Sequence, residues 1–126
     1  LSKRGPDFQD VYHDEFVALG HRRLSILDTR SIAHQPMWDE SNRYCIVFNG
    51  EIFNYRELRN ELEKNGIAFH TESDTEVLLK LFINQGESCL SQLNGFFAFC
   101  IYDKQDQTLF VARDRYGIKP LLYLFN

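Results

Sequence analysis

The interpretation of this chain depends on one stretch, Val47-Phe48-Asn49-Gly50-Glu51-Ile52-Phe53-Asn54-Tyr55. An apolar run leads into its Asn-Gly pair, and a carboxylate follows. Asn-Gly between apolar segments is a strong signal for a β-hairpin turn, although the arm beyond it is short for a pairing strand. The alternative is a strand end that faces a ligand. In that case the uncovered Gly50 N–H and the Asn49 amide are neighbouring donors, as in an oxyanion hole.

Length and composition indicate one domain, or part of one. The chain has 126 residues, of which 44% are hydrophobic, so it can bury a core. A net charge of −4 without a Lys/Arg cluster argues against nucleic acid or an anionic membrane as a partner. The longest apolar run, Phe96 to Tyr102, is too short to span a bilayer, and no signal peptide is visible.

The cysteines and histidines do not predict a metal site. Cys45, Cys89 and Cys100 are odd in number and widely spaced among apolar or helical neighbours, which predicts buried free thiols and a reducing cytoplasm. The four histidines show no ligand spacing either, so we expect no metal.

Two helices are predicted after the central stretch. Asn54 and Glu57 form a capping-box pattern, and Leu58 and Leu62 follow as an apolar stripe that ends near Gly66. A second capping box, Ser73-Asp74-Thr75-Glu76, opens a helix whose buried face carries Val77, Leu78, Leu81 and Phe82 and which ends at Gly86. Asp74 then lies in the first turn, where the helix dipole favours its ionised form. An equally good explanation of Asp74 is that it simply suits a first turn.

The remaining segments predict strands and loops. Residues 1–14 are polar and contain no expected strand, and Phe16 to Leu27 is strand-like with a bulge at Gly20. The other predicted elements are a loop at 28–39, a buried strand at 44–48, a short helix at 87–93, strands at 96–103, 109–112 and 121–125, and a solvated charged loop at 113–120. This order of elements predicts an α+β fold with helices packed on sheets.

Several stretches together resemble one family, the glutamine amidotransferase domain of glutamine-hydrolysing asparagine synthetase. They cover nearly the whole chain in order: 3–7 (Lys-Arg-Gly-Pro-Asp), 20–26 (Gly-His-Arg-Arg-Leu-Ser-Ile), 34–37 (His-Gln-Pro-Met), 49–55 (Asn-Gly-Glu-Ile-Phe-Asn-Tyr), 73–77 (Ser-Asp-Thr-Glu-Val) and 112–120 (Ala-Arg-Asp-Arg-Tyr-Gly-Ile-Lys-Pro). Sister amidotransferases that act on sugar phosphates usually lack the Arg-Arg-Leu-Ser-Ile run and the Glu after Asn-Gly. Lys3 departs from the family's usual histidine.

The resemblance implies a four-layer αββα sandwich of the N-terminal-nucleophile hydrolase type. Residues 1–126 would be a partial type 2 amidotransferase domain. The family's nucleophile is a cysteine at the mature N-terminus, and this chain starts at Leu1, with no cysteine near that end. We therefore expect the chain alone to be inactive, with the cysteine strand upstream and a synthetase domain downstream in the parent protein.

The resemblance also assigns site residues. Asn49 and Gly50 match the oxyanion hole, Arg23 matches the residue that holds the α-carboxylate of glutamine, and Glu51 and Asp74 match the acceptors of its α-ammonium group. Backbone groups near Leu24 and Ile26 line the same pocket in the family. Chemistry supports these roles, because a guanidinium grips a carboxylate through two hydrogen bonds and paired carboxylates favour a cation between them.

The implied function is hydrolysis of glutamine to supply ammonia for ATP-dependent amidation of aspartate. The implied partners are L-glutamine, the synthetase domain of the same polypeptide and a second copy in a homodimer. The domain itself needs no cofactor, whereas the synthetase domain would need ATP and Mg. The alternative is a relict domain that binds a ligand or supports a synthetase domain without catalysis.

Overall fold

Two antiparallel sheets and two helices form the described part of the molecule. The computed structural model describes residues 8–23 and 34–117. Strands β1 (Phe8–His13) and β2 (Ala18–Arg23) form a hairpin. The second sheet has the order β3-β4-β5-β6, with bounds Met37–Trp38, Tyr44–Ile52, Gly95–Asp103 and Thr108–Arg113. The helices are α1 (Tyr55–Lys64) and α2 (Asp74–Gln85), and a 3₁₀ helix, η2 (Gly86–Gln92), follows α2.

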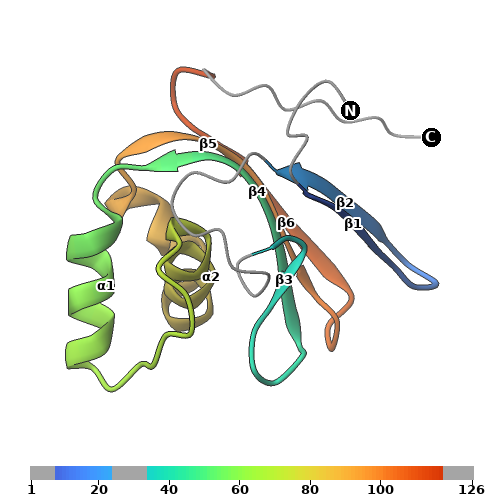
Figure 1. Ribbon diagram of the computed structural model, residues 1–126, viewed down its shortest axis with the longest axis horizontal. Helices are drawn as coiled ribbons and strands as arrows, with labels where there is room; N and C mark the ends of the chain where they lie inside the picture. The colour runs from blue at the N-terminus through green and yellow to red at the C-terminus, as the bar shows by residue number, and fades with distance from the viewer. Residues whose placement is uncertain (1–7, 24–33, 118–126) are drawn as a thin grey trace.

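The elements stack in three layers. The helices cover one face of the four-stranded sheet and the β1–β2 hairpin lies on the other side (Figure 1). The α+β prediction is confirmed, and these layers follow the α, β, β order of the expected sandwich. The fourth, helical layer of that sandwich is not among the described residues.

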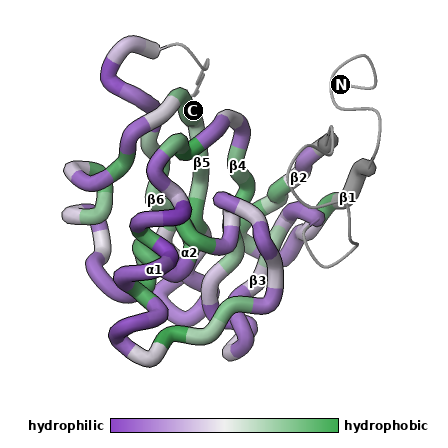
Figure 2. The backbone as a smooth tube through the Cα atoms, turned by 60° about the vertical axis from the view of Figure 1, so that its left-hand side comes forward, coloured by the Kyte–Doolittle hydropathy of each residue, from purple (hydrophilic) through white to green (hydrophobic). Residues whose placement is uncertain are grey.

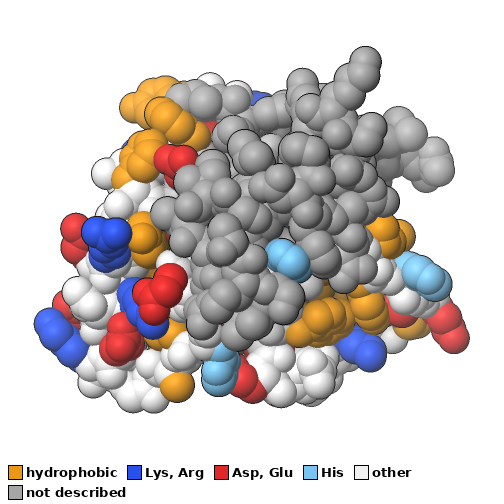
Figure 3. All heavy atoms as spheres, in the orientation of Figure 1, with side chains coloured by type: hydrophobic (Ala, Val, Ile, Leu, Met, Phe, Trp, Pro, Cys, Tyr) orange, Lys and Arg blue, Asp and Glu red, His pale blue; other side chains and the backbone are white. Residues whose placement is uncertain are grey.

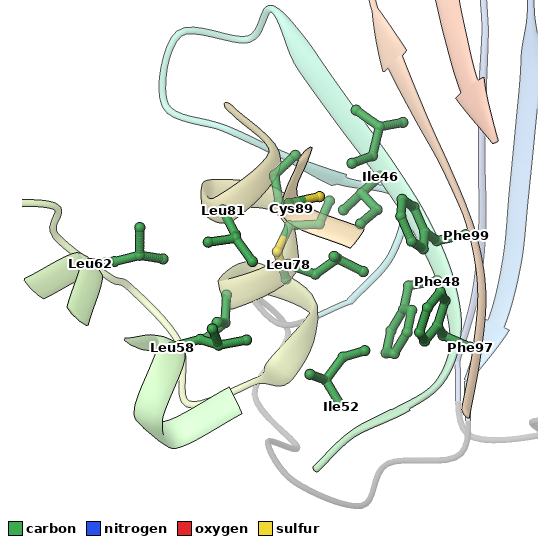
Figure 4. Close-up of a cluster of buried hydrophobic side chains, with 14 residues drawn as sticks. Ile46, Phe48, Ile52, Leu58, Leu62, Leu78, Leu81, Cys89, Phe97 and Phe99 are labelled. Atoms are coloured by element: carbon green, nitrogen blue, oxygen red, sulfur yellow. The ribbon is translucent and has the colours of Figure 1, made fainter. Parts of the chain in front are cut away.

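Strand β4 is central and contributes to both cores. Successive side chains of a strand point to opposite faces. Ile46 and Phe48 therefore pack with the helices, in a cluster that Figure 4 shows between α1, α2 and the sheet. Cys45 and Val47 pack on the opposite face with Leu19 and Tyr102, between the two sheets. The prediction of a strand buried on both faces is confirmed.

Helix α1 is held by its apolar stripe and its C-terminal turn. Leu58 and Leu62 are buried, on a helix that is otherwise mostly hydrophilic (Figure 2). Gly66, at φ +85°, donates to the Glu63 carbonyl, and Ile67 donates to the Leu62 carbonyl, which is a Schellman motif. The glycine at this end was correctly predicted.

The start of α1 differs from the predicted capping box. Asn54 is the N-cap residue but makes no side-chain capping bond. Its amide instead donates to the Gln92 carbonyl (2.7 Å) and accepts from the Asn94 N–H (3.0 Å). The side chain thus fastens α1 to the segment that leads into β5, because those two backbone groups are within its reach in the folded chain.

Helix α2 begins as predicted. The Ser73 hydroxyl accepts from the Glu76 N–H at 3.2 Å. Glu76 does not complete the box; its carboxylate accepts from His70 N–H, Thr71 N–H and the Thr71 hydroxyl. Val77, Leu78 and Leu81 are buried and Phe82 is partly buried, as expected, and Gly86 ends the helix.

The N-terminal hairpin was partly missed. Strand β1 lies where no strand was expected, and Gly20 pairs regularly with Val11, so the predicted bulge is wrong. The predicted strand segments 24–27 and 121–125 lie outside the described residues, and the predicted loop at 28–39 contains the short strand β3.

One carboxylate joins the hairpin to the main sheet. Asp14 accepts from the hydroxyls of Tyr12 (2.8 Å) and Tyr102 (2.9 Å) and from the backbone amides of Phe16 and Val17. Loss of solvent opposes ionisation, but these hydrogen bonds outweigh it and lower the pKa of Asp14 to about 2.

Charged side chains of both signs are mixed where they are coloured in Figure 3. No helix within residues 8–23 and 34–117 combines the length and apolar character that crossing a bilayer requires.

Candidate functional site

The Asn49-Gly50 pair lies inside a strand. Asn49 pairs with Ala98 and Gly50 with Phe97, in a β4–β5 ladder that continues to Ile52. The hairpin interpretation is therefore wrong, and the strand predicted to stop at Phe48 runs four residues further. The polar pair belongs to the edge of a sheet rather than to the tip of a turn.

Only glycine fits at position 50. Gly50 has φ +138°, and an added Cβ would lie 1.9 Å from the Phe96 carbonyl oxygen. This clash is with backbone of the neighbouring strand, so a side-chain rotation cannot relieve it. The glycine thus allows β4 and β5 to approach closely at this point.

The Gly50 N–H points to the outer edge of β4. In an antiparallel ladder, paired residues alternate between bonding to each other and pointing away. The N–H and C=O of Phe97, the partner of Gly50, bond instead to Asp114, on the β6 side. Gly50 and Phe97 are therefore a non-hydrogen-bonded pair, and the Gly50 amide faces away from β5.

Side chains occupy the same edge on either side of Gly50. The Phe48 N–H donates to Gln35 Oε1 (2.5 Å), and the Phe48 carbonyl accepts from His21 Nε2 (2.9 Å). The Ile52 N–H donates to Asp74 Oδ2 at 3.0 Å. The outward amide of Gly50 is flanked by these contacts.

Asp74 is a buried carboxyl at the start of α2. Only 6% of the surface of Asp74 is exposed. Burial raises its pKa above the ordinary value, against the hydrogen bonds from backbone amides, and the nearby Glu51 charge raises it further. The backbone amides at the helix start do favour the ionised form, as expected, but desolvation of the buried carboxyl outweighs them, so the pKa of Asp74 is raised overall.

The other predicted site residues are placed to different extents. Asn49 and Glu51 are exposed and, two residues apart on β4, share one face of the strand. Arg23 ends β2, two residues after His21, and its side chain lies outside the described part of the structure, as do Leu24 and Ile26. The structure thus brings Asn49, Gly50, Glu51 and Asp74 together.

Sequence reasoning missed two residues at this edge. Gln35 was predicted only as part of an extended loop segment, and His21 was considered only as a metal ligand. The available signal was that both lie in motifs of the resemblance, at 20–26 and 34–37. Their partners are 27 and 13 residues away in sequence, so local patterns could not reveal the contacts.

One residue of the predicted solvated loop at 113–120 is buried, whereas Arg113, Arg115 and Tyr116 are exposed as predicted. Asp114 is buried, and its carboxylate accepts from the Phe97 N–H (3.1 Å) and the Tyr116 N–H (3.1 Å). Asp114 thus continues the hydrogen bonding between β5 and β6 one residue beyond the end of β6. The carboxylate is buried where it accepts from these two backbone amides, one of which belongs to the buried Phe97.

One cluster resembles a metal site in composition. Donor atoms of Glu40, His70 and Glu76 lie within 4.8 Å of one another. The Lys80 ammonium group already contacts Glu40. Glu76 Oε1 accepts from the backbone N–H groups of His70 and Thr71, and Glu76 Oε2 accepts from the His70 N–H. The cluster therefore joins the β3–β4 turn to α2 without needing a cation.

The cysteines are poor nucleophiles. Burial raises the pKa of Cys45 to about 12 and those of Cys89 and Cys100 to about 11. A nucleophilic cysteine needs a thiolate, and thus a lowered pKa. All three are free thiols, as predicted; Cys45 and Cys89 are also buried, whereas Cys100 is only partly buried.

Comparison with known proteins gives the family. A profile described as "Glutamine amidotransferase domain" matches residues 1–126. The chain belongs to the glutamine amidotransferase domain family. This assignment agrees with the resemblance seen in the sequence motifs.

Relatives of this amidotransferase domain are much longer than the chain. It is 52% identical over 120 residues to asparagine synthetase [glutamine-hydrolyzing] 1 of Bacillus subtilis, which is 95% of this chain and 19% of that protein. It is 40% identical over 144 residues to a putative asparagine synthetase [glutamine-hydrolyzing] 2 of Methanocaldococcus jannaschii, covering 100% of the chain and 27% of that protein. The amidotransferase domain thus spans about a fifth to a quarter of these relatives.

A solved structure confirms the fold. Glutamine phosphoribosylpyrophosphate amidotransferase from B. subtilis, complexed with ADP and GMP, matches with a TM-score of 0.67 and 33% identity. The match covers 82% of this amidotransferase domain and 24% of that chain. The chain therefore has part of the α+β fold of N-terminal-nucleophile amidotransferases.

Proposed function

We propose that this domain hydrolyses glutamine and supplies ammonia to a synthetase domain of the same polypeptide, which amidates aspartate. The observation that carries the proposal is the outward Gly50 amide beside Asn49, with the Asp74 carboxylate bound two residues further along the strand. Family membership and the similarity to asparagine synthetases support the same activity.

Asn49 and Gly50 are the proposed oxyanion donors. Hydrolysis of an amide passes through a tetrahedral intermediate whose oxygen carries negative charge. The β4–β5 ladder holds the Gly50 N–H in place. The exposed side-chain amide of Asn49 comes from the neighbouring residue of the same strand. Donors fixed by a sheet stabilise such an oxygen without having to reorganise.

The α-groups of glutamine are proposed to bind to charged side chains around this edge. Glu51 and Asp74 would accept from the α-ammonium group, and Arg23 would hold the α-carboxylate. The raised pKa of Asp74 supports a cation at this place, because a bound ammonium group would offset the cost of its buried charge. Backbone groups near Leu24 and Ile26 complete the proposed pocket.

The nucleophile is proposed to lie in a part of the protein other than these 126 residues. Cys45, Cys89 and Cys100 have raised pKa values, so none of them suits the role. We therefore expect the isolated 126-residue chain to release no ammonia from glutamine. ATP and Mg would belong to the synthetase domain, and the free thiols are compatible with the cytoplasm.

The test uses the full-length protein that contains this domain. We expect ammonia release from glutamine, and asparagine formation from aspartate and ATP with either glutamine or ammonia. A relict domain would give asparagine with ammonia alone. Glutamine consumption at the background rate, in protein that is active with ammonia, would therefore overturn the proposal.

A further inference from the structure

The strand that carries Asn49 and Gly50 extends beyond its neighbour on one side. The last β3–β4 pair joins Met37 to Ile46. Continuing this register would place Gln35 opposite Phe48, where a further backbone pair could form. The Gln35 side chain takes the Phe48 N–H instead.

Gln35 makes two hydrogen bonds from a buried position. It is 5% exposed; Oε1 accepts from the Phe48 N–H (2.5 Å) and Nε2 donates to the Thr75 hydroxyl (3.2 Å). The orientation of the amide is fixed, because a backbone N–H can only donate and must therefore face the oxygen. One side chain thus links β4 to α2, and Thr75 is itself buried.

The two linked positions adjoin the site. Phe48 directly precedes Asn49, and Thr75 directly follows Asp74. The Phe48 carbonyl accepts from His21 Nε2 at 2.9 Å, so both backbone polar groups of Phe48 are bound by side chains. The Gln35 amide thus bonds to Phe48, which lies one and two residues before the proposed oxyanion donors Asn49 and Gly50, and to Thr75, which follows the proposed ammonium acceptor Asp74.

We propose that Gln35 is a positioning residue for glutamine hydrolysis: its amide fixes the spacing between the strand that carries Asn49 and Gly50 and the helix start that carries Asp74. This inference rests on the proposed function. Glutamine spans both places, since its amide reacts at one end and its α-ammonium group binds at the other. A small change in that spacing would misplace the reacting carbonyl, and a shift of about 1 Å can cost about 100-fold in rate.

The first test replaces Gln35 in the full-length protein. Gln35→Met keeps the length of the side chain and removes both hydrogen bonds. We expect kcat/KM for glutamine to fall at least about tenfold, with the ammonia-dependent rate of asparagine formation unchanged. Gln105→Met, at an exposed turn position, is the matched control and should keep wild-type values.

A second pair of variants separates positioning from folding. Thr75→Val removes the hydroxyl and keeps the shape, whereas Thr75→Ser keeps the hydroxyl. We expect Thr75→Val to lower kcat/KM for glutamine and Thr75→Ser to retain it. The Gln35→Met/Thr75→Val double variant should be about as impaired as Gln35→Met alone, because both changes break one link.

The outcomes distinguish this inference from the function on which it rests. If Asn49→Ala is impaired while Gln35→Met and Thr75→Val keep wild-type kcat/KM, Gln35 has no positioning role and the function stands. If the wild-type protein hydrolyses no glutamine, both fail. Should Gln35→Met not fold, the Thr75 pair decides: equal rates for Val and Ser overturn the inference, and a deficit in Val alone supports it.

Discussion

Asp74 Oδ2 accepts the Ile52 N–H at 3.0 Å, so the first turn of α2 is bonded to the end of β4. The carboxylate lies on the same strand edge as the outward Gly50 amide. A group that could bind a cation and a group that could bind an oxyanion are thus held on one rigid edge. Substitutions in the full-length protein that contains this domain separate the contributions of these groups.

Asn49→Ala should lower kcat with glutamine and leave KM nearly unchanged. The amide is proposed to donate to charge that develops only in the transition state, so its loss should cost about 3 kcal/mol there. Steady-state kinetics with glutamine and with ammonia measure this. Asn60→Ala, on the exposed face of α1, is the control. A normal glutamine kcat in Asn49→Ala, or an equal loss with ammonia, would require the oxyanion role to be withdrawn.

Arg23→Ala should show the opposite kinetic pattern. The α-carboxylate of glutamine is the same in the ground state and the transition state. Removal of the guanidinium that is proposed to hold it should therefore raise KM with little change in kcat. The ammonia-dependent rate should not change. A variant that bound glutamine normally but turned it over slowly would contradict this assignment.

The KM for glutamine should rise as the pH falls, and the rise should begin above the pH at which an ordinary aspartic acid titrates, about 3.9. The reason is that burial raises the pKa of Asp74, and the protonated carboxyl cannot pair with an ammonium group. Asp74→Asn should have a high KM that lacks this pH dependence. Its amide oxygen can still accept from the Ile52 N–H, so the link to β4 should survive. An acid rise in KM that persisted in Asp74→Asn would assign the titration to another group.

Gly50→Ala should destabilise the domain far more than Gly66→Ala. Both glycines have positive φ, but an added Cβ meets the Phe96 carbonyl oxygen at 1.9 Å at position 50 and nothing within 4 Å at position 66. We expect a loss of about 1–2 kcal/mol for Gly66→Ala from backbone strain alone and more than about 3 kcal/mol for Gly50→Ala. Denaturant unfolding measures both. Equal losses would show that the two strands can separate at low cost.

The domain should lose stability between about pH 4 and pH 2 through Asp14. Its pKa is lowered to about 2 in the folded protein, whereas an unfolded aspartic acid titrates near 3.9. The sign follows: the stabilisation is present above the unfolded pKa and is lost as the pH falls through the folded pKa. Asp14→Asn should therefore be less stable than wild type at pH 6 and nearly equal to it at pH 2.

Urea unfolding at a series of pH values checks the Asp14 prediction. Glu15→Gln removes the same charge from the neighbouring exposed residue and is the matched control. A constant difference between Asp14→Asn and wild type across this range would show that the carboxylate charge contributes nothing beyond its shape.

Local signals predicted the elements, and long-range contacts decided the details. Ser73 to Glu76 correctly predicted the start of α2, because a capping bond involves only neighbours. Asn54 also marked a helix start, but its side chain bonds to Gln92 and Asn94, which local spacing cannot reveal. Asn49-Gly50 is a hairpin signal that failed because pairing with β5 holds it extended.

The residue types of the proposed site came from the resemblance, whereas the contacts that support them could not be predicted. The resemblance gave Asn49, Gly50, Glu51 and Asp74, which the fold brings together. The raised pKa of Asp74 and the buried role of Asp114 depend on what covers each carboxylate, and a sequence pattern does not show that. Strand β1 was missed because its partner, β2, supplies the pairing that its own polar sequence does not indicate.

The side chains along the β4 edge also determine what can bind there. Gln35 and His21 occupy the polar groups of Phe48, and Asp74 occupies the Ile52 amide. An incoming peptide strand needs a row of alternating free donors and acceptors, as in edge-to-edge aggregation or β-augmentation. Between these occupied groups, Gly50 is the one outward-facing residue whose polar groups no described side chain binds, so the described part of this edge gives another chain no register to pair with.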